Sequence, residues 1–380
     1  MKPSAELHIP SLDGMRGVAA LIVFVSHAAL PDLVPGAFGV TVFFFLSGYL
    51  ITTLLRRELE SAGRIALGSF YLRRVYRILP PMYIVLVLAV MLDLTGVFNS
   101  QMTFQGVLAQ FAHLTNYYII YFGPNDLAPA TSIMWSLAVE EHFYLLFPLA
   151  LGLLYRHFGS RGIAGVLLAV CALVLLWRMY LVFVSGLGHD YTYFATDTRV
   201  DSMLYGCILG VWCNPALDHS ARTPGKGTWM ALLAVSVGLL LFTFLYRSES
   251  FRESFRYSIQ GIALFSIFFC AVRFHHWPLF AWLETRPMRA MGLISYTFYL
   301  THVPSIELLK RHFDLGVWER TAWAFLLTVA LSTAMYYLVE RRMAALRKRL
   351  HGHQKPQVSK PDPAGGERAS GVRVVPPALP

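Results

Sequence analysis

Arg16 and His27 lie eleven residues apart in an otherwise apolar stretch, 12–30, that has the length of a membrane-spanning helix. A charged side chain at bilayer depth costs about 2.5–3.5 kcal/mol or more, so ionisable groups in such a helix indicate a functional site. Histidine titrates closest to neutral pH and can accept or release a proton during a reaction. Eleven residues are about three helical turns, or about 16 Å, so both side chains are expected on one face of the helix.

The composition predicts that this helix is one of many. Hydrophobic residues make up 56% of the chain and charged residues only 14%, which is typical of an integral membrane protein and excludes an ordinary soluble domain. Apolar runs of spanning length predict an all-α fold, a polytopic transmembrane helix bundle of about ten spans, at 12–30, 38–55, 80–98, 135–156, 162–185, 199–214, 228–246, 256–273, 290–308 and 321–340. The segment 104–122 is aromatic and amphipathic but contains His113 and Asn116, so it is expected to be interfacial or re-entrant.

Lysine and arginine collect on one predicted side of the bundle, and positively charged loops stay in the cytoplasm. The loop 56–79 contains six arginines, whereas 31–37 and 98–134 contain no lysine or arginine. The asymmetry predicts cytoplasmic N- and C-termini. Two predicted outer loops break the pattern, and their basic residues are Arg247, Arg252, Lys310, Arg311 and Arg320.

Two regions of different character are expected along the chain. The spans fill residues 1–350, which are predicted to form one transmembrane domain whose first helix is retained, because no small-residue cleavage site follows it. Residues 351–380 are rich in proline, glycine and charge and are predicted to be a disordered cytoplasmic tail. The net charge of +10 concentrates in this tail and in the arginine loop, where anionic membrane lipids, and not nucleic acid, are the expected partner.

Several chemistries find no support in the sequence. The four cysteines form no CxxC motif or Cys/His cluster at metal-ligand spacing, so no metal site is expected. A nucleotide-binding glycine loop and a Walker-type lysine are both missing, which argues against an ATP-driven pump.

Six blocks of sequence, in order along residues 9–310, resemble the acyltransferase-3 family of integral membrane O-acyltransferases. They are IPSLDGMRGVAALIVFVSHAAL, FGVTVFFFLSGYLITTLLRRE, SFYLRRVYRILPPMY, MWSLAVEEHFYLLFPL, DTRVDSMLYGCILG and ISYTFYLTHVP. The resemblance implies a ten-helix bundle that takes an acyl group, usually acetyl from cytoplasmic acetyl-CoA, and passes it to a hydroxyl of a glycan or another acceptor. It implies acyl-CoA as a donor substrate instead of a permanently bound cofactor, and a bacterial inner-membrane location. Some members carry an additional SGNH hydrolase-like domain, and this chain is expected to be the stand-alone form.

The family's first-helix pattern is an arginine and a histidine separated by ten residues, which Arg16 and His27 match. Acylation of a hydroxyl needs a base that takes the proton as the oxygen attacks the thioester. His27 is therefore expected to be catalytic, either as this base or as a nucleophile that becomes an acyl-imidazole. Asp13 lies one turn before Arg16 and is expected to pair with it, for orientation or for donor binding.

The arginines Arg73, Arg74 and Arg77 precede Pro80 and Pro81, which are expected to open the third span. Arginine suits phosphate recognition, so these residues are candidates for binding the phosphates of CoA, with Arg73 and Arg77 on one face and Arg74 elsewhere. The alternative is an ordinary positive-inside cluster.

Other candidates line the predicted site less specifically. Ser47 is a site-lining candidate, and its neighbour Gly48 is expected to allow close helix packing. Glu140 and Glu141 are about 100° apart on a helix, so one is expected to face the site, where it would raise the basicity of His27. The remaining candidates are polar residues expected to line the substrate site or to stabilise the bundle: Asp197, Arg199, Asp201, Tyr296 and His302.

The sequence thus predicts an O-acetyltransferase that uses acyl-CoA and a glycan or lipid-linked glycan acceptor. Within this chemistry, a larger acyl group or a small-metabolite acceptor is the alternative. A proton-coupled transporter or glycan-lipid flippase, with Arg, His and Glu as a proton relay, is the alternative from another class. A third alternative is a membrane scaffold whose polar residues only hold helices together.

Overall fold

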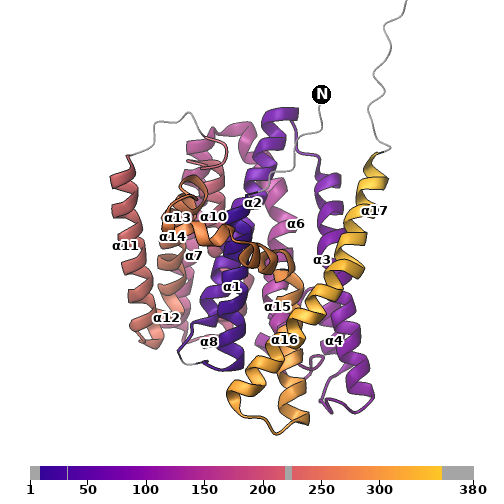
Figure 1. The fold of residues 1–380 in the computed structure, drawn as a ribbon. Coiled ribbons are helices and arrows are strands. Elements are labelled where there is room, and N and C mark those ends of the chain that lie inside the picture. The colour runs from indigo at the N-terminus through magenta and orange to yellow at the C-terminus, as the bar shows by residue number, and fades with distance from the viewer. Residues whose placement is uncertain (1–8, 32, 219–224, 353–380) are drawn as a thin grey trace, which may run out of the picture.

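The computed structural model describes residues 9–31, 33–218 and 225–352, and every regular element within these residues is helical (Figure 1). The first half contains α1 (Pro10–Ala28), α2 (Gly36–Ala62), α3 (Leu67–Leu94), α4 (Phe104–Phe111), α5 (Thr115–Phe122), α6 (Trp135–His157) and α7 (Ser160–Tyr180). The second half contains α8 (His189–Phe194), α9 (Thr196–Arg199), α10 (Asp201–Val211), α11 (Lys226–Leu245), α12 (Glu249–Ser254), α13 (Arg256–Arg273), α14 (Pro278–Ala281), α15 (Arg286–His312), α16 (Val317–Met335) and α17 (Arg341–Gly352).

Six helical segments in the described residues are long and apolar enough to cross a membrane: Gly36–Ala62, Leu67–Leu94, Ser132–His157, Ser160–Ser185, Lys226–Leu245 and Val317–Arg347. A seventh is possible by the same measure where α13 and the following short helical segment meet at an angle of 89°. These spans confirm a polytopic helical membrane protein.

All ten predicted ranges overlap helices, although α1, α10 and α15 fall outside that test of length and apolarity. These three helices pack extensively on other helices of the bundle: α1 packs on α15 and α2, and α10 packs on α2. All eleven residues of α10 are buried. A helix surrounded by other helices does not face lipid along its length, so it can be shorter or more polar than a lipid-facing span.

Glycine allows the closest helix contacts at the centre of the bundle. A Cβ atom on Gly48 would lie 2.0 Å from the carbonyl oxygen of Met203, and one on Gly206 would lie 2.0 Å from that of Phe45. These contacts hold α2 against α10 and confirm the packing role predicted for Gly48. Small residues permit such backbone approach between membrane helices.

The third helix begins earlier than the sequence predicts. α3 starts at Leu67, so the three arginines lie within it and Pro80 and Pro81 are inside the helix instead of opening it. The apolar pattern marks only the part of the helix in the bilayer, and the polar turns continue beyond it.

The segment 104–122 forms two short helices, α4 and α5, and not a span. His113, between them, has a left-handed backbone with φ +56°, which breaks the helix.

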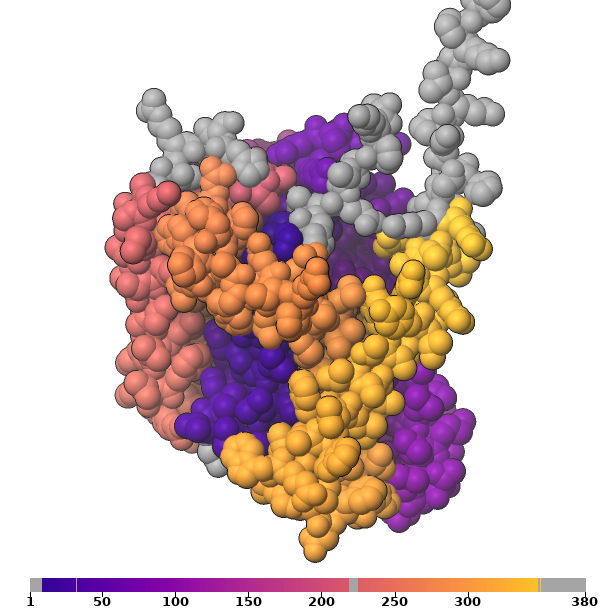
Figure 2. All heavy atoms as spheres, in the orientation of Figure 1, coloured from indigo at the N-terminus to yellow at the C-terminus, as the bar shows by residue number. Residues whose placement is uncertain are grey.

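The two ends of the bundle contain different connections. Figure 1 places the α2–α3 loop and the end of α17 at the upper end, and α8, α12 and the loop after α1 at the lower end. In Figure 2, atoms of the N-terminal helices (indigo) reach the surface between α11 and the α15–α16 pair. The N-terminal helices are therefore central but not fully covered.

Candidate active site

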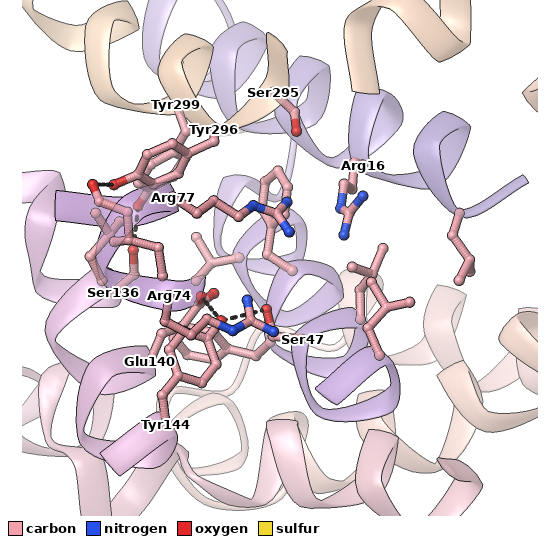
Figure 3. A pocket seen from close by; sticks show the side chains of 18 of the residues that line it. Arg16, Ser47, Arg74, Arg77, Ser136, Glu140, Tyr144, Ser295, Tyr296 and Tyr299 are labelled. Carbon is pink, nitrogen blue, oxygen red and sulfur yellow. Dashed lines mark hydrogen bonds between the residues drawn. The ribbon is translucent and has the colours of Figure 1, made fainter. Parts of the chain in front are cut away.

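A cavity of about 270 Å³ opens among α1, α2, α3, α6 and α15 (Figure 3). Its apolar walls include Val40, Phe43, Phe44, Leu46 and Leu50 from α2. Its polar lining consists of Asp13, Arg16, Ser47, Arg74, Arg77, Ser136, Glu140, Glu141, Tyr144, Ser295, Tyr296 and Tyr299. Eight of the residues predicted from the sequence are therefore brought to one cavity: Asp13, Arg16, Ser47, Arg74, Arg77, Glu140, Glu141 and Tyr296.

Arg16 reaches the cavity from α1 and is paired within its own helix. Its Nη1 lies 3.0 Å from Oδ1 of Asp13, as the one-turn spacing predicts. A Cβ atom on Gly292 would lie only 1.9 Å from the Asp13 carbonyl oxygen, so α15 fixes this turn of α1 by direct backbone contact. The ion pair is therefore held on a rigid part of the cavity wall.

Arg74 belongs to a connected polar cluster with α6 and α2. Its guanidinium lies over the ring of Tyr144, 4.8 Å from the centroid, and Tyr144 donates a hydrogen bond to Glu140. The Tyr144 hydroxyl is also 3.1 Å from Ser47 Oγ. Three helices thus hold Arg74 in one orientation at the cavity.

The arginines divide differently from the sequence prediction. Arg74 and Arg77 both line the cavity, and Figure 3 shows their side chains entering it together with Arg16. Arg73 instead turns to Glu58, with Nη2 to Oε2 at 3.5 Å, and its side chain is 40% exposed. The expected grouping of Arg73 with Arg77 is therefore wrong, because a spacing of three residues also brings side chains to one helix face.

Glu140 and Glu141 both line the cavity, although only one was expected to face it. Oε1 of Glu141 is buried and has no hydrogen-bond partner among the residues that the structure describes. Among the described residues, no hydrogen bond or ion pair joins either glutamate to His27. The partner of His27 is a histidine.

His27 and His302 form a pair next to this cavity and are not part of its lining. Nδ1 of His27 is 2.9 Å from the carbonyl oxygen of Val23 and 3.2 Å from Nε2 of His302. Nδ1 of His302 is 2.6 Å from the carbonyl oxygen of Tyr299. His27 is exposed and His302 is completely buried.

The two carbonyl contacts assign the ring protons, because a carbonyl oxygen only accepts hydrogen bonds. Both neutral rings then carry the proton on Nδ1, and Nε2 of His302 accepts from His27. Nε2 of His27 is left with its lone pair, which a base or a nucleophile requires. Tyr299 links the histidine pair to the cavity, since its hydroxyl lies 2.8 Å from Ser136 Oγ on the cavity wall.

Asp201 lies away from the cavity in a completely buried cluster. Its Oδ2 is 2.7 Å from Nη2 of Arg178, and neither side chain is exposed. Arg178 also donates to the carbonyl oxygens of Thr198 and Ser254, at 2.5 and 2.9 Å, and to Ser258 Oγ at 2.6 Å. The cluster joins α7, α9, α10, α12 and α13, which favours the stabilising alternative for Asp201.

Arg199 and Asp197 are also outside the cavity. Arg199 is completely buried, and its guanidinium lies 3.9 Å from the centroid of the Tyr257 ring. Asp197 accepts a hydrogen bond from Trp177 Nε1 at 2.7 Å and from Tyr191 at 3.3 Å. Their aromatic surroundings anchor the short helices α8 and α9 to α7 and α13.

Sequence reasoning missed Tyr144, Arg178 and the serines Ser136 and Ser295 as parts of these clusters. Tyr144 lies four residues after Glu140 on the same helix, so the spacing was a usable signal. Arg178 is 23 residues from its partner, and no local pattern indicates that contact.

The fold and the cavity define a class of polytopic membrane protein with an arginine-rich polar site among its helices. Residues 9–337 match the acyltransferase domain of the acyltransferase-3 family, and the chain belongs to this family. The match extends over both the cavity and the histidine pair.

Two relatives show how much of a longer protein this chain resembles. O-acetyltransferase OatA of Staphylococcus aureus is 30% identical over 340 residues, which are 86% of this chain and 55% of the relative. Peptidoglycan O-acetyltransferase OatA of Listeria monocytogenes is 28% identical over 334 residues, 85% of this chain and 53% of the relative. The chain therefore spans about half the length of these relatives. No solved structure matches it.

Proposed function

We propose that this protein is a membrane O-acetyltransferase that moves acetyl from acetyl-CoA to a hydroxyl of a cell-envelope or secreted glycan. The observation that carries the proposal is the meeting of Arg16, Arg74 and Arg77 at one cavity inside a membrane bundle. Guanidinium groups bind phosphates through paired hydrogen bonds, and CoA brings a pyrophosphate and a 3′-phosphate. The names of the two relatives agree with O-acetyl transfer.

The donor is proposed to enter from the cytoplasmic side. Small-molecule pockets are about 300–1,000 Å³, so the cavity of about 270 Å³ holds only part of a CoA molecule. The arginines at the end of α2 and in the first turns of α3 support a cytoplasmic position for this end of the bundle, with both termini proposed on the same side. The membrane is proposed to be a bacterial cytoplasmic membrane.

His27 is proposed to carry the chemistry through Nε2. In the direct route, Nε2 takes the proton of the acceptor hydroxyl while the hydroxyl oxygen attacks the thioester carbonyl carbon. The C–S bond breaks, an ester forms, and the CoA thiolate leaves and takes up the proton. In the two-step route, Nε2 itself attacks the thioester carbonyl carbon, the C–S bond breaks and the CoA thiolate leaves. The acceptor oxygen then attacks the acyl carbon, the C–N bond to the imidazole breaks, and the hydroxyl proton passes to the thiolate through solvent.

His302 is proposed to position His27. It accepts from Nδ1 of His27 and is itself fixed by the Tyr299 carbonyl oxygen. The arrangement keeps the proton of His27 on Nδ1 and leaves Nε2 available in either route.

The test uses protein in lipid nanodiscs with radiolabelled acetyl-CoA and extracted envelope glycans. Wild type is expected to release CoA and to label the glycan, whereas His27→Ala should fold and do neither. Label that stays on the wild-type protein through His27 selects the two-step route.

A different result redirects the assignment. If wild type consumes propionyl- or succinyl-CoA but not acetyl-CoA, the donor group is wrong and the acyltransferase chemistry stands. If no acyl-CoA is consumed with glycan present, the enzymatic proposal fails, and proton-coupled transport becomes the function to test.

A further inference from the structure

A second cavity, of about 310 Å³, has a wall built from the end of α1, the loop to α2, and parts of α8, α11, α12 and α13. These elements meet at the lower end of the bundle in Figure 1, whereas the loop between α2 and α3 is at the upper end. The basic and amide side chains that line the cavity are His189, Arg247, Arg252, Arg256 and Gln260. Arg247 and Arg252 belong to one of the predicted outer loops that break the positive-inside pattern.

The described lining of this cavity contains three arginines and a histidine and no aspartate or glutamate. Glu253 lies behind the described wall and is 6% exposed. Its Oε1 lies 2.8 Å from Nδ1 of His189 and 3.9 Å from Nη2 of Arg256. This carboxylate therefore pairs with two basic side chains, and the described lining of the cavity carries a net positive charge.

Arg256 gives the most specific indication of a ligand. The residue is only 7% exposed, and its Nη2 donates to the Tyr257 hydroxyl at 2.9 Å. Its buried Nε has no acceptor among the described residues. A buried donor without a partner is unfavourable, and an anion in the cavity would supply the missing acceptor.

The cavity also borders the catalytic helix. Ser26, the residue before His27, forms part of its wall, and consecutive Cα atoms are about 3.8 Å apart. A Cβ atom on Gly36 would lie 2.6 Å from Ser26 Oγ, so α2 packs directly on this turn of α1. A ligand in this cavity would lie next to the turn that carries His27.

We infer that this electropositive cavity binds an anionic group, carboxylate or phosphate, of the acyl acceptor. The inference rests on the proposed function, because it assigns the acceptor to one end of the bundle and acyl-CoA to the arginines of the other cavity. The acceptor class is then an acidic glycan or a phosphate-linked glycan instead of a neutral sugar. Arginine forks bind both anions with the same geometry.

Direct binding to the protein in nanodiscs tests the inference at low salt. Tetragalacturonate is the carboxylate probe, inorganic pyrophosphate is the phosphate probe, and chitotetraose is the neutral control. The cavity proposed for acyl-CoA is kept saturated with a non-hydrolysable acetyl-CoA analogue, so that the anions cannot occupy it. At least one anion should bind, and the neutral sugar should not.

Variants locate the binding. Arg252→Gln, whose native side chain is exposed, and Arg247→Gln should each weaken anion binding about tenfold, as expected for one charged hydrogen bond. Lys310→Gln is the matched control, because it removes an exposed charge near the end of α15, outside this cavity, and should leave affinity unchanged. Binding of only one probe identifies carboxylate or phosphate as the recognised group.

Two results would overturn the inference: no anion binding by wild type, or equal affinity in wild type, Arg247→Gln and Arg252→Gln. Wild-type acetyl-CoA consumption with envelope glycan is measured separately on the same preparation. Anion binding that depends on these arginines, in a protein that consumes no acyl-CoA, leaves the anion site standing and refutes the proposed function. Acyl-CoA consumption without anion binding supports the proposed function and refutes the anion site.

Discussion

Removing the Asp201 carboxylate should destabilise the bundle severely. Arg178 and Asp201 are both completely buried and 2.7 Å apart. In Asp201→Ala, the guanidinium keeps the acceptors Thr198 O, Ser254 O and Ser258 Oγ but loses its counter-charge. An uncompensated buried charge of this kind costs about 3–5 kcal/mol in the free energy of unfolding.

Two further variants separate charge from packing. Asp201→Asn keeps one oxygen acceptor and should lose about 1.5–3 kcal/mol, the value of a hydrogen bond to a charged group. The double variant Arg178→Met with Asp201→Val removes both charges and should recover much of the loss, because an apolar replacement leaves no buried ion. Asp190→Ala, at an exposed position of α8, should stay within about 0.5 kcal/mol of wild type.

The assay is denaturant unfolding in mixed micelles, followed by tryptophan fluorescence, with acetyl-CoA consumption measured per folded protein. A stabilising role predicts low stability and near-normal activity of the folded fraction. If Asp201→Ala instead unfolds within about 1 kcal/mol of wild type and has lost activity, the reasoning from burial is refuted. Asp201 would then be an acceptor-side residue.

Three other changes test the arginine-lined cavity, the helix packing and the pairing of Glu253. Arg74→Gln should raise the KM for acetyl-CoA about tenfold through loss of a charged hydrogen bond, whereas steady-state kinetics of Arg73→Gln should show little change, because Arg73 faces Glu58. Gly206→Ala should lower the free energy of unfolding by about 1–3 kcal/mol in the same assay, because its Cβ would meet a carbonyl oxygen at 2.0 Å. Gly238→Ala is the control and should not destabilise the protein, because a Cβ there meets nothing within 4 Å. Burial opposes ionisation of Glu253, but hydrogen bonds from α8 hold the pKa of its carboxyl below the ordinary 4.5. The stability that the Glu253 carboxylate adds is present above pH 4.5 and is lost as the pH falls through the lowered pKa. Wild type and Glu253→Gln should therefore converge in their free energies of unfolding in acid. A difference that stays constant with pH would contradict the pairing.

The apolar pattern predicted where helices lie but not where they end. Each predicted range overlaps a helix, because burial in lipid or protein requires a continuous apolar run. α3 begins at Leu67, 13 residues before the predicted 80, since polar turns outside the bilayer remain helical without a hydropathy signal. The short, buried α10 shows the opposite effect, because neighbouring helices replace lipid around it.

The site was predictable to the extent that its contacts are local. Asp13 and Arg16 meet because they are one turn apart. Whether Arg73 or Arg74 faces the cavity depends on how α3 is rotated, and that rotation is fixed by the packing of Arg74 on Tyr144 of α6. The contact between His27 and His302 spans 275 residues, so the sequence identified both histidines but not their pairing.

The two arginine-lined cavities give the proposed reaction a direction through the membrane. In the proposed reaction, the phosphates of acyl-CoA need cations at the end assigned to the cytoplasm, where the positive-inside rule already favours arginine. That rule does not explain the basic lining of the other cavity. That lining includes Arg247 and Arg252, which break the rule, and a buried Arg256 whose Nε has no acceptor within the described part of the chain. His27 lies on the helix that reaches both cavities, one residue beyond Ser26 and three turns beyond Arg16. On this geometry, acyl-CoA and an anionic acceptor approach His27 from opposite ends of one helix, so transfer of the acyl group need not move either substrate across the bilayer.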